Sequence, residues 1–171
     1  METRAQNEED GGGACRCAII TVSDTETIES DQRGLEILDL VRAASHHVLE
    51  RTVVPHDPAR IHRILRHWLG AAVDAIFLSG DGVPGQGVGL VDVVRPFLEK
   101  ELPGFAEILR HLAFREMGPA AILVETVAGF CRGKALFAIP GSKDILRRAV
   151  ESLILPVLPH VVARARLQEK V

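Results

Sequence analysis

Five glycines stand within residues 80–89, directly after an apolar run that begins at Ala75. A short buried strand that leads into a glycine-rich loop and then a helix is how an α/β domain builds a phosphate-binding turn. Glycine permits a sharp turn and a close approach of the backbone to a ligand. The feature therefore favours an α/β domain that binds an anionic ligand beside this loop.

The spacing of Gly80, Gly82 and Gly85 matches the dinucleotide-binding fingerprint G-x-G-x-x-G. Two residues inside the match disfavour that interpretation. Pro84 has no N–H to offer a phosphate, and Asp81 places a negative charge where a phosphate would sit. The preceding strand is also the third predicted strand, whereas a Rossmann domain carries the fingerprint in its first turn. We therefore prefer another kind of phosphate-binding loop.

The composition narrows the class of protein. The chain has 171 residues, of which 47% are hydrophobic and 25% charged, as in one ordinary globular domain. Its formal net charge of −3 argues against a non-specific nucleic-acid binder. No apolar run approaches the roughly 20 residues that cross a bilayer, and the acidic start of the chain is unlike a signal peptide. We therefore expect a cytoplasmic protein without a membrane or nucleic-acid partner.

Residues 1–14 are polar and charged and include three consecutive glycines. We expect a disordered N-terminal arm there and a single domain over residues 15–171. The chain has three cysteines, Cys15, Cys17 and Cys131. An odd number without a secretory signal argues against a disulfide framework. Because no second pair of cysteines or histidines stands at zinc-like spacing, we predict no metal site and interpret the first two cysteines as the start of a strand.

Apolar spacing divides the first half of the domain into alternating strands and helices. This alternation is typical of parallel strands joined by crossover helices. The second helix begins at Asp57 and Pro58, a favoured N-cap followed by a favoured first residue. The predicted strands cover residues 17–22, 48–54 and 75–79, and the predicted helices cover residues 31–44, 57 onward and 90–98.

The second half follows a different order. After a further amphipathic helix come two β-like runs, residues 126–130 and 135–139. Residues 132–134 between them predict a hairpin turn. A final helix starts near Lys143 and is interrupted at Pro156. The whole order predicts a three-layer α/β/α sandwich, with a mainly parallel sheet and a late antiparallel hairpin.

Ligands of such sheets bind beyond the carboxyl ends of the strands. Four loops of this chain follow a predicted parallel strand, namely residues 23–25, 55–57, 80–89 and 140–142. If these loops cluster, they form a polar site that is rich in backbone N–H donors. The sequence therefore predicts a site sized for an anionic ligand at one edge of the sheet.

Several segments match one known family in the same order along the chain. They read AIITVSDT at residues 18–25, VPHDPARI at residues 54–61, DAIFLSG at residues 74–80 and IPGS at residues 139–142. Together they resemble the molybdenum cofactor biosynthesis proteins of the MoaB/Mog type, over nearly everything from Cys17 to about His160. The resemblance implies the MogA-like molybdopterin-binding fold and a homo-oligomer, either a trimer or a hexamer.

Members of this family bind molybdopterin and, where active, transfer adenylate to it from Mg-ATP. The resemblance implies the same ligand and the same co-substrate for this chain. It further implies that glycines and hydroxyl-bearing turns hold the pterin and its phosphate. The residues carried over as ligand-binding are Ser23, Asp24, Thr25, Gly80, Gly82, Pro140, Gly141 and Ser142.

The catalytic positions of the family are only partly retained. Asp57 matches the carboxylate after the second strand, and its role as a helix N-cap is compatible with catalysis. Val88 stands where the family has a second catalytic aspartate, and valine neither binds Mg²⁺ nor transfers a proton. Asp81, from a neighbouring position, could supply the missing metal ligand. Asp57 and Asp81 are therefore the candidate catalytic residues.

Two acidic residues stand where the family has a neutral or a basic one. Asp81 replaces a glycine and would repel a bound phosphate by about 1 kcal/mol or more at an effective dielectric of about 20. Glu125 replaces an arginine and adds a second carboxylate. These departures predict a pterin-binding protein without the usual adenylyltransferase chemistry. Two alternatives stay open: an inactive paralogue that acts as a scaffold or partner protein, and a nucleotide-phosphate hydrolase of the competence-associated type.

Overall fold

The computed structural model describes residues 13–80 and 89–169. Its described strands form one sheet of six, in the order β2-β1-β3-β6-β5-β4. The first four are parallel, whereas β5 and β4 add in antiparallel fashion. The strands are β1 (Arg16–Val22), β2 (His47–Val54), β3 (Ala75–Gly80), β4 (Lys100–Glu101), β5 (Val127–Cys131) and β6 (Lys134–Pro140).

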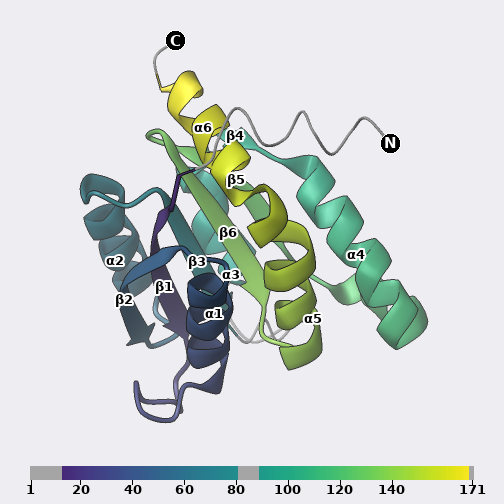
Figure 1. Ribbon diagram of the computed structural model, residues 1–171. Coiled ribbons are helices and arrows are strands. Elements are labelled where there is room, and N and C mark those ends of the chain that lie inside the picture. Colours follow the sequence, from purple (N-terminus) through teal and green to yellow (C-terminus); the bar gives the residue numbers. More distant parts are fainter. Residues whose placement is uncertain (1–12, 81–88, 170–171) are drawn as a thin grey trace, which may run out of the picture.

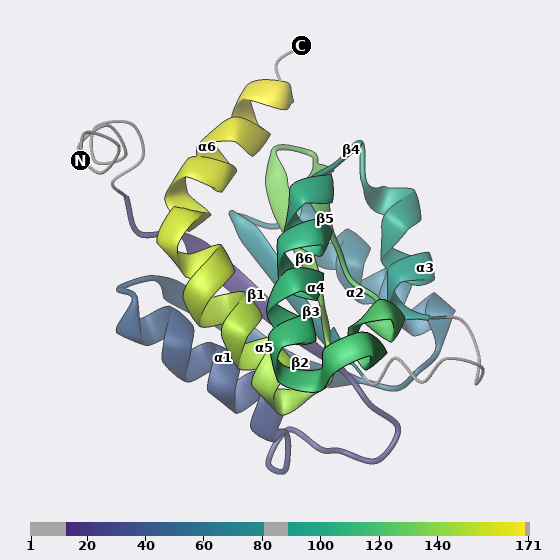
Figure 2. The ribbon, with the colours of Figure 1, turned by 90° about the vertical axis from the view of Figure 1, so that its right-hand side faces the viewer.

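Helices cover both faces of the sheet (Figures 1 and 2). One face packs against α1, α4, α5 and α6, and the other against α2 and α3. The predicted three-layer sandwich is thus confirmed. The helices are α1 (Gln32–Ala43), α2 (Pro58–Gly70), α3 (Leu90–Val94), α4 (Pro103–Met117), α5 (Lys143–Arg148) and α6 (Leu158–Gln168). Three 3₁₀ turns, η1 (Arg95–Phe97), η2 (Gly118–Leu123) and η4 (Leu155–Val157), and one π-helix, η3 (Ala149–Ile154), complete the helical segments.

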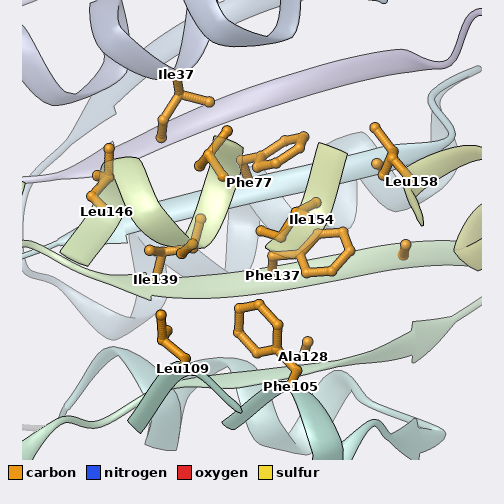
Figure 3. Close-up of a cluster of buried hydrophobic side chains, with 14 of the residues drawn as sticks. Ile37, Phe77, Phe105, Leu109, Ala128, Phe137, Ile139, Leu146, Ile154 and Leu158 are labelled. Carbon is orange, nitrogen blue, oxygen red and sulfur yellow. The ribbon is translucent and has the colours of Figure 1, made fainter. Parts of the chain in front are cut away.

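Each face of the sheet has its own hydrophobic core, because successive side chains of the central strands point to opposite faces. All six residues of β3 are buried, because a parallel strand between two helical layers has no solvent-facing side. Phe77 and Phe137 stack with ring centroids 5.6 Å apart on the α5 side of the sheet, and Phe105 of α4 meets Phe137 edge-on (Figure 3). Ile76 and Leu136 point to the α2 side.

Local sequence signals place most element ends correctly. Asp57 caps α2, and Asp31 caps α1. Arg132 and Gly133 both have positive φ, as a two-residue hairpin turn requires, so the turn is one residue shorter than the predicted 132–134. The last predicted helix is interrupted around Pro156, where the 3₁₀ turn η4 separates η3 from α6.

Two elements were not predicted. Strand β4 is only two residues long and pairs with Phe130 and Gly129 of β5. The 3₁₀ turn η2 follows α4 directly. The predicted arm lies outside the described residues except for Gly13 and Ala14, so it stays a prediction. Within the described ranges no helix is long and apolar enough to cross a membrane.

Candidate functional site

The four parallel strands end level with one another. Val22 at the end of β1 pairs with Val54 of β2 on one side and with Gly80 of β3 on the other. Gly80 in turn pairs with Pro140 of β6. The loops after these strands therefore leave the sheet side by side at its carboxyl edge, as the sequence predicts for a ligand site.

The loop after β1 is held by its own hydroxyl and by the neighbouring loop. The Ser23 Oγ accepts hydrogen bonds from the N–H groups of Thr25 (3.3 Å) and Glu26 (3.2 Å), which is a turn typical of serine. The Asp24 carboxylate accepts a hydrogen bond of 2.7 Å from the His56 N–H. Ser23 and Asp24 therefore shape the loop, whereas the side chain of Thr25 is exposed at the edge.

Asp57 acts as the N-cap of α2. Its Oδ1 accepts hydrogen bonds from the N–H groups of Ala59 (2.8 Å) and Arg60 (3.4 Å), and its Oδ2 lies 3.8 Å from the Arg60 Nε. The capping role that the sequence indicates is therefore confirmed. The side chain stays 48% exposed, so the carboxylate also faces solvent at the edge where the strands end.

Gly80 is closely packed. A Cβ at this position would lie 3.1 Å from the Val22 Cβ, a tight contact, and 3.5 Å from the Leu90 Cδ2. The glycine therefore lets the end of β3 approach β1 and the start of α3. The other loop residues that the sequence singles out, Asp81, Gly82 and Val88, lie outside the described residues.

The loop after β6 presents an exposed hydroxyl. Ser142 precedes α5, and its carbonyl accepts a hydrogen bond of 2.8 Å from the Leu146 N–H. Its side chain makes no capping hydrogen bond to the helix and is exposed. Gly141 is partly exposed beside it. The Ser142 hydroxyl is therefore accessible at the carboxyl edge.

Two carboxylates flank the point where the chain re-enters the described structure. A Cβ on Gly89 would lie 3.0 Å from the Glu125 Oε2 and 3.3 Å from the Asp92 Oδ2. Sequence reasoning identified Glu125 but missed Asp92, because an acid in the first turn of a helix has an ordinary role there. Asp92 stands three residues after Gly89, the last glycine of the loop, and this position could have indicated that Asp92 lies near the ligand.

A buried polar network lies just below the strand ends. Asp31 has no exposed surface and accepts hydrogen bonds from Thr21 Oγ1 (3.0 Å), Gly34 N (2.8 Å) and Arg51 Nη1 (2.8 Å). The Thr21 hydroxyl also lies 3.4 Å from the Ser79 Oγ. These residues come from the start of α1 and from three neighbouring strands. The network therefore holds α1 and the strands in place beneath the loops.

Comparison with known proteins agrees with this architecture. A family model described as a probable molybdopterin binding domain matches residues 18–160. Molybdenum cofactor biosynthesis protein B of Halalkalibacterium halodurans is 40% identical over 167 residues, which cover 92% of this chain and 94% of the relative. The protein of the same name from Bacillus subtilis is 34% identical over 164 residues, which cover 94% and 96%.

Solved structures of this family share the fold. A crystal structure of molybdenum cofactor biosynthesis protein B matches with a TM-score of 0.85 at 30% identity, over 91% of this chain and 98% of that one. The tungsten cofactor synthesizing protein MoaB of Pyrococcus furiosus matches with a TM-score of 0.79 at 25% identity, over 90% and 98%. The predicted fold class is thereby confirmed. The chain belongs to the molybdopterin-binding domain family, among the molybdenum cofactor biosynthesis proteins of the MoaB type.

Proposed function

We propose that this protein binds molybdopterin, or a related phosphorylated pterin, at the carboxyl edge of its sheet and does not transfer adenylate to it from Mg-ATP. The observation that carries the proposal is the common level of the four strand ends, from Val54 through Val22 and Gly80 to Pro140. The loops after β1, β2 and β6 then face one ligand beside the end of β3. Membership of the molybdopterin-binding family supports the same ligand class.

The described residues at this edge fit the polar parts of a pterin. Thr25 and Ser142 are exposed hydroxyls on two different loops, and each can donate one hydrogen bond and accept others. Gly141 brings backbone close to the same edge without a side chain in the way. A bound pterin would supply the dithiolene that coordinates molybdenum, while the chain orients it and shields one side of it from water.

The charges at the same edge oppose a triphosphate. Glu125 and Asp92 bring two carboxylates to Gly89, where the family pattern has an arginine in place of Glu125. Two negative charges repel phosphate oxygens at short range, and Val88 offers no metal ligand to offset them. Asp57 is the one retained catalytic carboxylate, and it already caps α2. We therefore infer pterin binding of reduced affinity, without adenylyl transfer.

We further propose that the chain forms a homo-oligomer. Large apolar side chains are exposed together on α4 and η2: Phe114 at 56%, Met117 at 43%, Ile122 at 83% and Leu123 at 65%. An exposed apolar patch of this kind usually marks a contact surface. Light scattering of the parent is expected to give a multiple of 18.6 kDa, and Ile122→Glu is expected to lower the mass. A monomeric parent would overturn the proposal.

The deciding experiment is a titration of the full chain with molybdopterin and, separately, with Mg-ATP, followed by an assay for adenylated pterin. We expect measurable binding of the pterin and no adenylated product. Failure to bind either ligand would favour a scaffold role, which the acidic edge at Gly89 also supports. If adenylated product forms, Asp81→Ala tests whether Asp81 has taken over as metal ligand, because the variant then loses Mg-ATP binding.

A further inference from the structure

Strand β2 forms one end of the sheet, with a hollow on each of its faces. Among the described strands β2 pairs with β1 alone. On the α2 side lies a cavity of about 470 Å³, here called the β2–α2 groove, which is lined by Thr52, Val53, Val54, Pro55, Arg60, Arg63, Ile64 and His67. A second cavity of about 460 Å³ lies on the side of the loop after β1.

The helical wall of the β2–α2 groove is strongly basic. Helix α2 contains three arginines and two histidines and no acidic residue, within a chain whose net charge is −3. Like charges three or four residues apart destabilise a helix, so this spacing carries a cost. Within the described residues Arg63 forms no ion pair, and Arg60 has one weak contact of 3.8 Å with Asp57. On the same face of β2, Glu50 accepts a hydrogen bond of 3.1 Å from the Thr52 hydroxyl and forms no ion pair within the described residues. The two arginines of the groove therefore have little direct counter-charge.

The spacing of Arg60 and Arg63 is compatible with an acidic strand. With a rise of about 1.5 Å per residue, the two arginines lie about 4.5 Å apart along the helix axis, and each guanidinium ends a long side chain. Acidic side chains two residues apart on an extended strand are about 7 Å apart, a distance that two such arginine side chains can span. The preference for an extended ligand therefore rests on the open edge of β2.

The backbone of β2 offers the other half of such a site. The Val54 carbonyl accepts a hydrogen bond from Ser23 N at 2.9 Å, so the peptide groups of Val54 face β1. Because facing alternates along a strand, the N–H and C=O groups of Val53 and Arg51 face the open edge. An unpaired edge of this kind binds a further strand through main-chain hydrogen bonds.

We propose that the β2–α2 groove binds an extended acidic segment of a partner protein, which adds to β2 as a further strand and sets acidic side chains against Arg60 and Arg63. This surface adjoins the pterin site, because Pro55 and Arg60 of the groove lie on either side of Asp57 in the sequence, but the proposal does not depend on pterin binding. A second copy of the chain is a poor occupant. Two β2 strands joined about a twofold axis would place two basic α2 helices on the same face of one continuous sheet.

The opposite face of β2 restricts the partner's other side chains. The lining of the second cavity includes the carboxylates of Asp24 and Glu26. The Arg51 guanidinium in that cavity is already held by Asp31 Oδ2 and by the Ile28 carbonyl, both at 2.8 Å. Acidic side chains are therefore disfavoured on this face. The partner strand is expected to alternate acidic residues toward α2 with apolar or basic residues toward the second cavity.

A synthetic peptide with alternating Glu and Val tests the proposal on the full chain, with a Lys and Val peptide for comparison. Fluorescence anisotropy is expected to show binding of the acidic peptide alone. Arg63→Glu is expected to weaken that binding by about tenfold. Arg66→Glu is the matched control, because Arg66 is an exposed arginine of the same helix that does not line the groove. Equal weakening by both variants would overturn the proposal.

Strand addition has its own readout. Bound peptide is expected to slow amide hydrogen exchange at Arg51 and Val53, whose N–H groups face the open edge. A peptide N-methylated at alternate residues keeps its charges but loses half of its donors, and it is expected to bind at least tenfold more weakly. Unchanged exchange, or displacement of the peptide by millimolar inorganic phosphate, would point to a simple anion site and refute strand addition.

Discussion

The two edges of the sheet differ in what their charged groups do. At the amino edge Asp74, at the start of β3, accepts hydrogen bonds from Arg16 N (2.8 Å), Arg16 Nε (3.2 Å) and Arg166 Nη2 (2.7 Å). At the carboxyl edge Glu125 and Asp92 form no ion pair within the described residues, although both lie beside Gly89. The carboxylate at the amino edge is neutralised by arginines, whereas these two carboxylates at the carboxyl edge are not.

This contrast separates stability from ligand binding. The buried Asp74 carboxylate and its two partly exposed arginine partners fix the start of β1, the start of β3 and the last helix in one arrangement. Unpaired charges at the other edge add little to stability but set the electric field that a ligand meets. Substitutions at the amino edge should therefore change the free energy of unfolding, and substitutions at the carboxyl edge should change ligand affinity. Four experiments test this division.

The largest effect is expected for Asp74→Ala. The side chain of Asp74 is only 5% exposed, and its removal leaves Arg16 and Arg166 without their partner. We expect the free energy of unfolding to fall by roughly 2–4 kcal/mol, measured by urea denaturation, with unchanged pterin affinity. Asp39→Ala is the control, since this exposed aspartate should change stability by less than about 0.5 kcal/mol. A loss of pterin affinity in folded Asp74→Ala would contradict the separation of stability at the amino edge from ligand binding at the carboxyl edge.

At the carboxyl edge Glu125→Arg reverses one charge beside Gly89. We expect the affinity for phosphorylated pterin to rise about tenfold, equivalent to about 1.4 kcal/mol, because a repulsive carboxylate becomes an attractive cation. Glu107→Arg on the outer surface of α4 is the matched charge reversal and should leave affinity unchanged. Titration calorimetry measures both. The urea midpoint of Glu125→Arg should match the parent, and a large shift in it would contradict a purely electrostatic role.

Acid should weaken the amino edge in two steps. Burial, and then the nearby His47, lowers the pKa of His46 from its ordinary 6.5, so its contribution is present above about pH 6.5 and is lost as the pH falls through the folded pKa. Burial alone would raise the pKa of Asp74, but hydrogen bonds from Arg16 and Arg166 offset it and lower the pKa from 3.8 to about 2. The contribution of Asp74 is therefore lost between about pH 4 and pH 2.

Urea midpoints measured from pH 8 to pH 2 check this sequence. His46 Nδ1 accepts a hydrogen bond of 3.1 Å from Cys15 N, and protonation at that nitrogen removes the acceptor. His46→Asn should therefore flatten the upper step and leave the lower one. His111→Asn, at an exposed histidine of α4, should leave both steps. An unchanged upper step in His46→Asn would show that another group carries it.

The smallest effect is expected for Ser142→Ala. Its hydroxyl makes no capping hydrogen bond, so the free energy of unfolding should change by less than about 0.5 kcal/mol. Loss of one hydrogen bond to the pterin should lower affinity by about fivefold, near 1 kcal/mol. Ser152→Ala, at an exposed serine of η3, is the control. Equal affinities for the parent and Ser142→Ala would remove this residue from the site.

Local signals in the sequence were sufficient for most of the fold. Asp57 followed by Pro58 predicts the start of α2 because the N-cap hydrogen bonds form within three residues. The positions of the strands follow from apolar runs such as Ala75–Gly80. Such a run is apolar throughout because helices cover both faces of the sheet, so every residue of the strand is buried. The common level of the four strand ends then follows from parallel pairing.

Contacts between distant residues could not be predicted in this way. Asp74 meets Arg166 across 92 positions of sequence, and no local pattern marks either residue as a partner. The proximity of Glu125 and Asp92 likewise depends on how β5 and α3 approach Gly89. Strand β4 is recognisable only by its pairing with Phe130 and Gly129, since two residues carry no periodicity.

The place of β6 between β3 and β5 has a consequence for synthesis on the ribosome. Residues 134–140 complete the sheet beside β3, although β3 itself ends at Gly80. Until the ribosome has released Lys134 to Pro140, β3 is an edge strand whose six residues are all apolar or small. An exposed edge strand of this kind pairs with other chains and leads to aggregation. A nascent chain of about 120 residues therefore needs a chaperone more than the finished protein does. The half-life of the nascent chain should lengthen as β6 emerges.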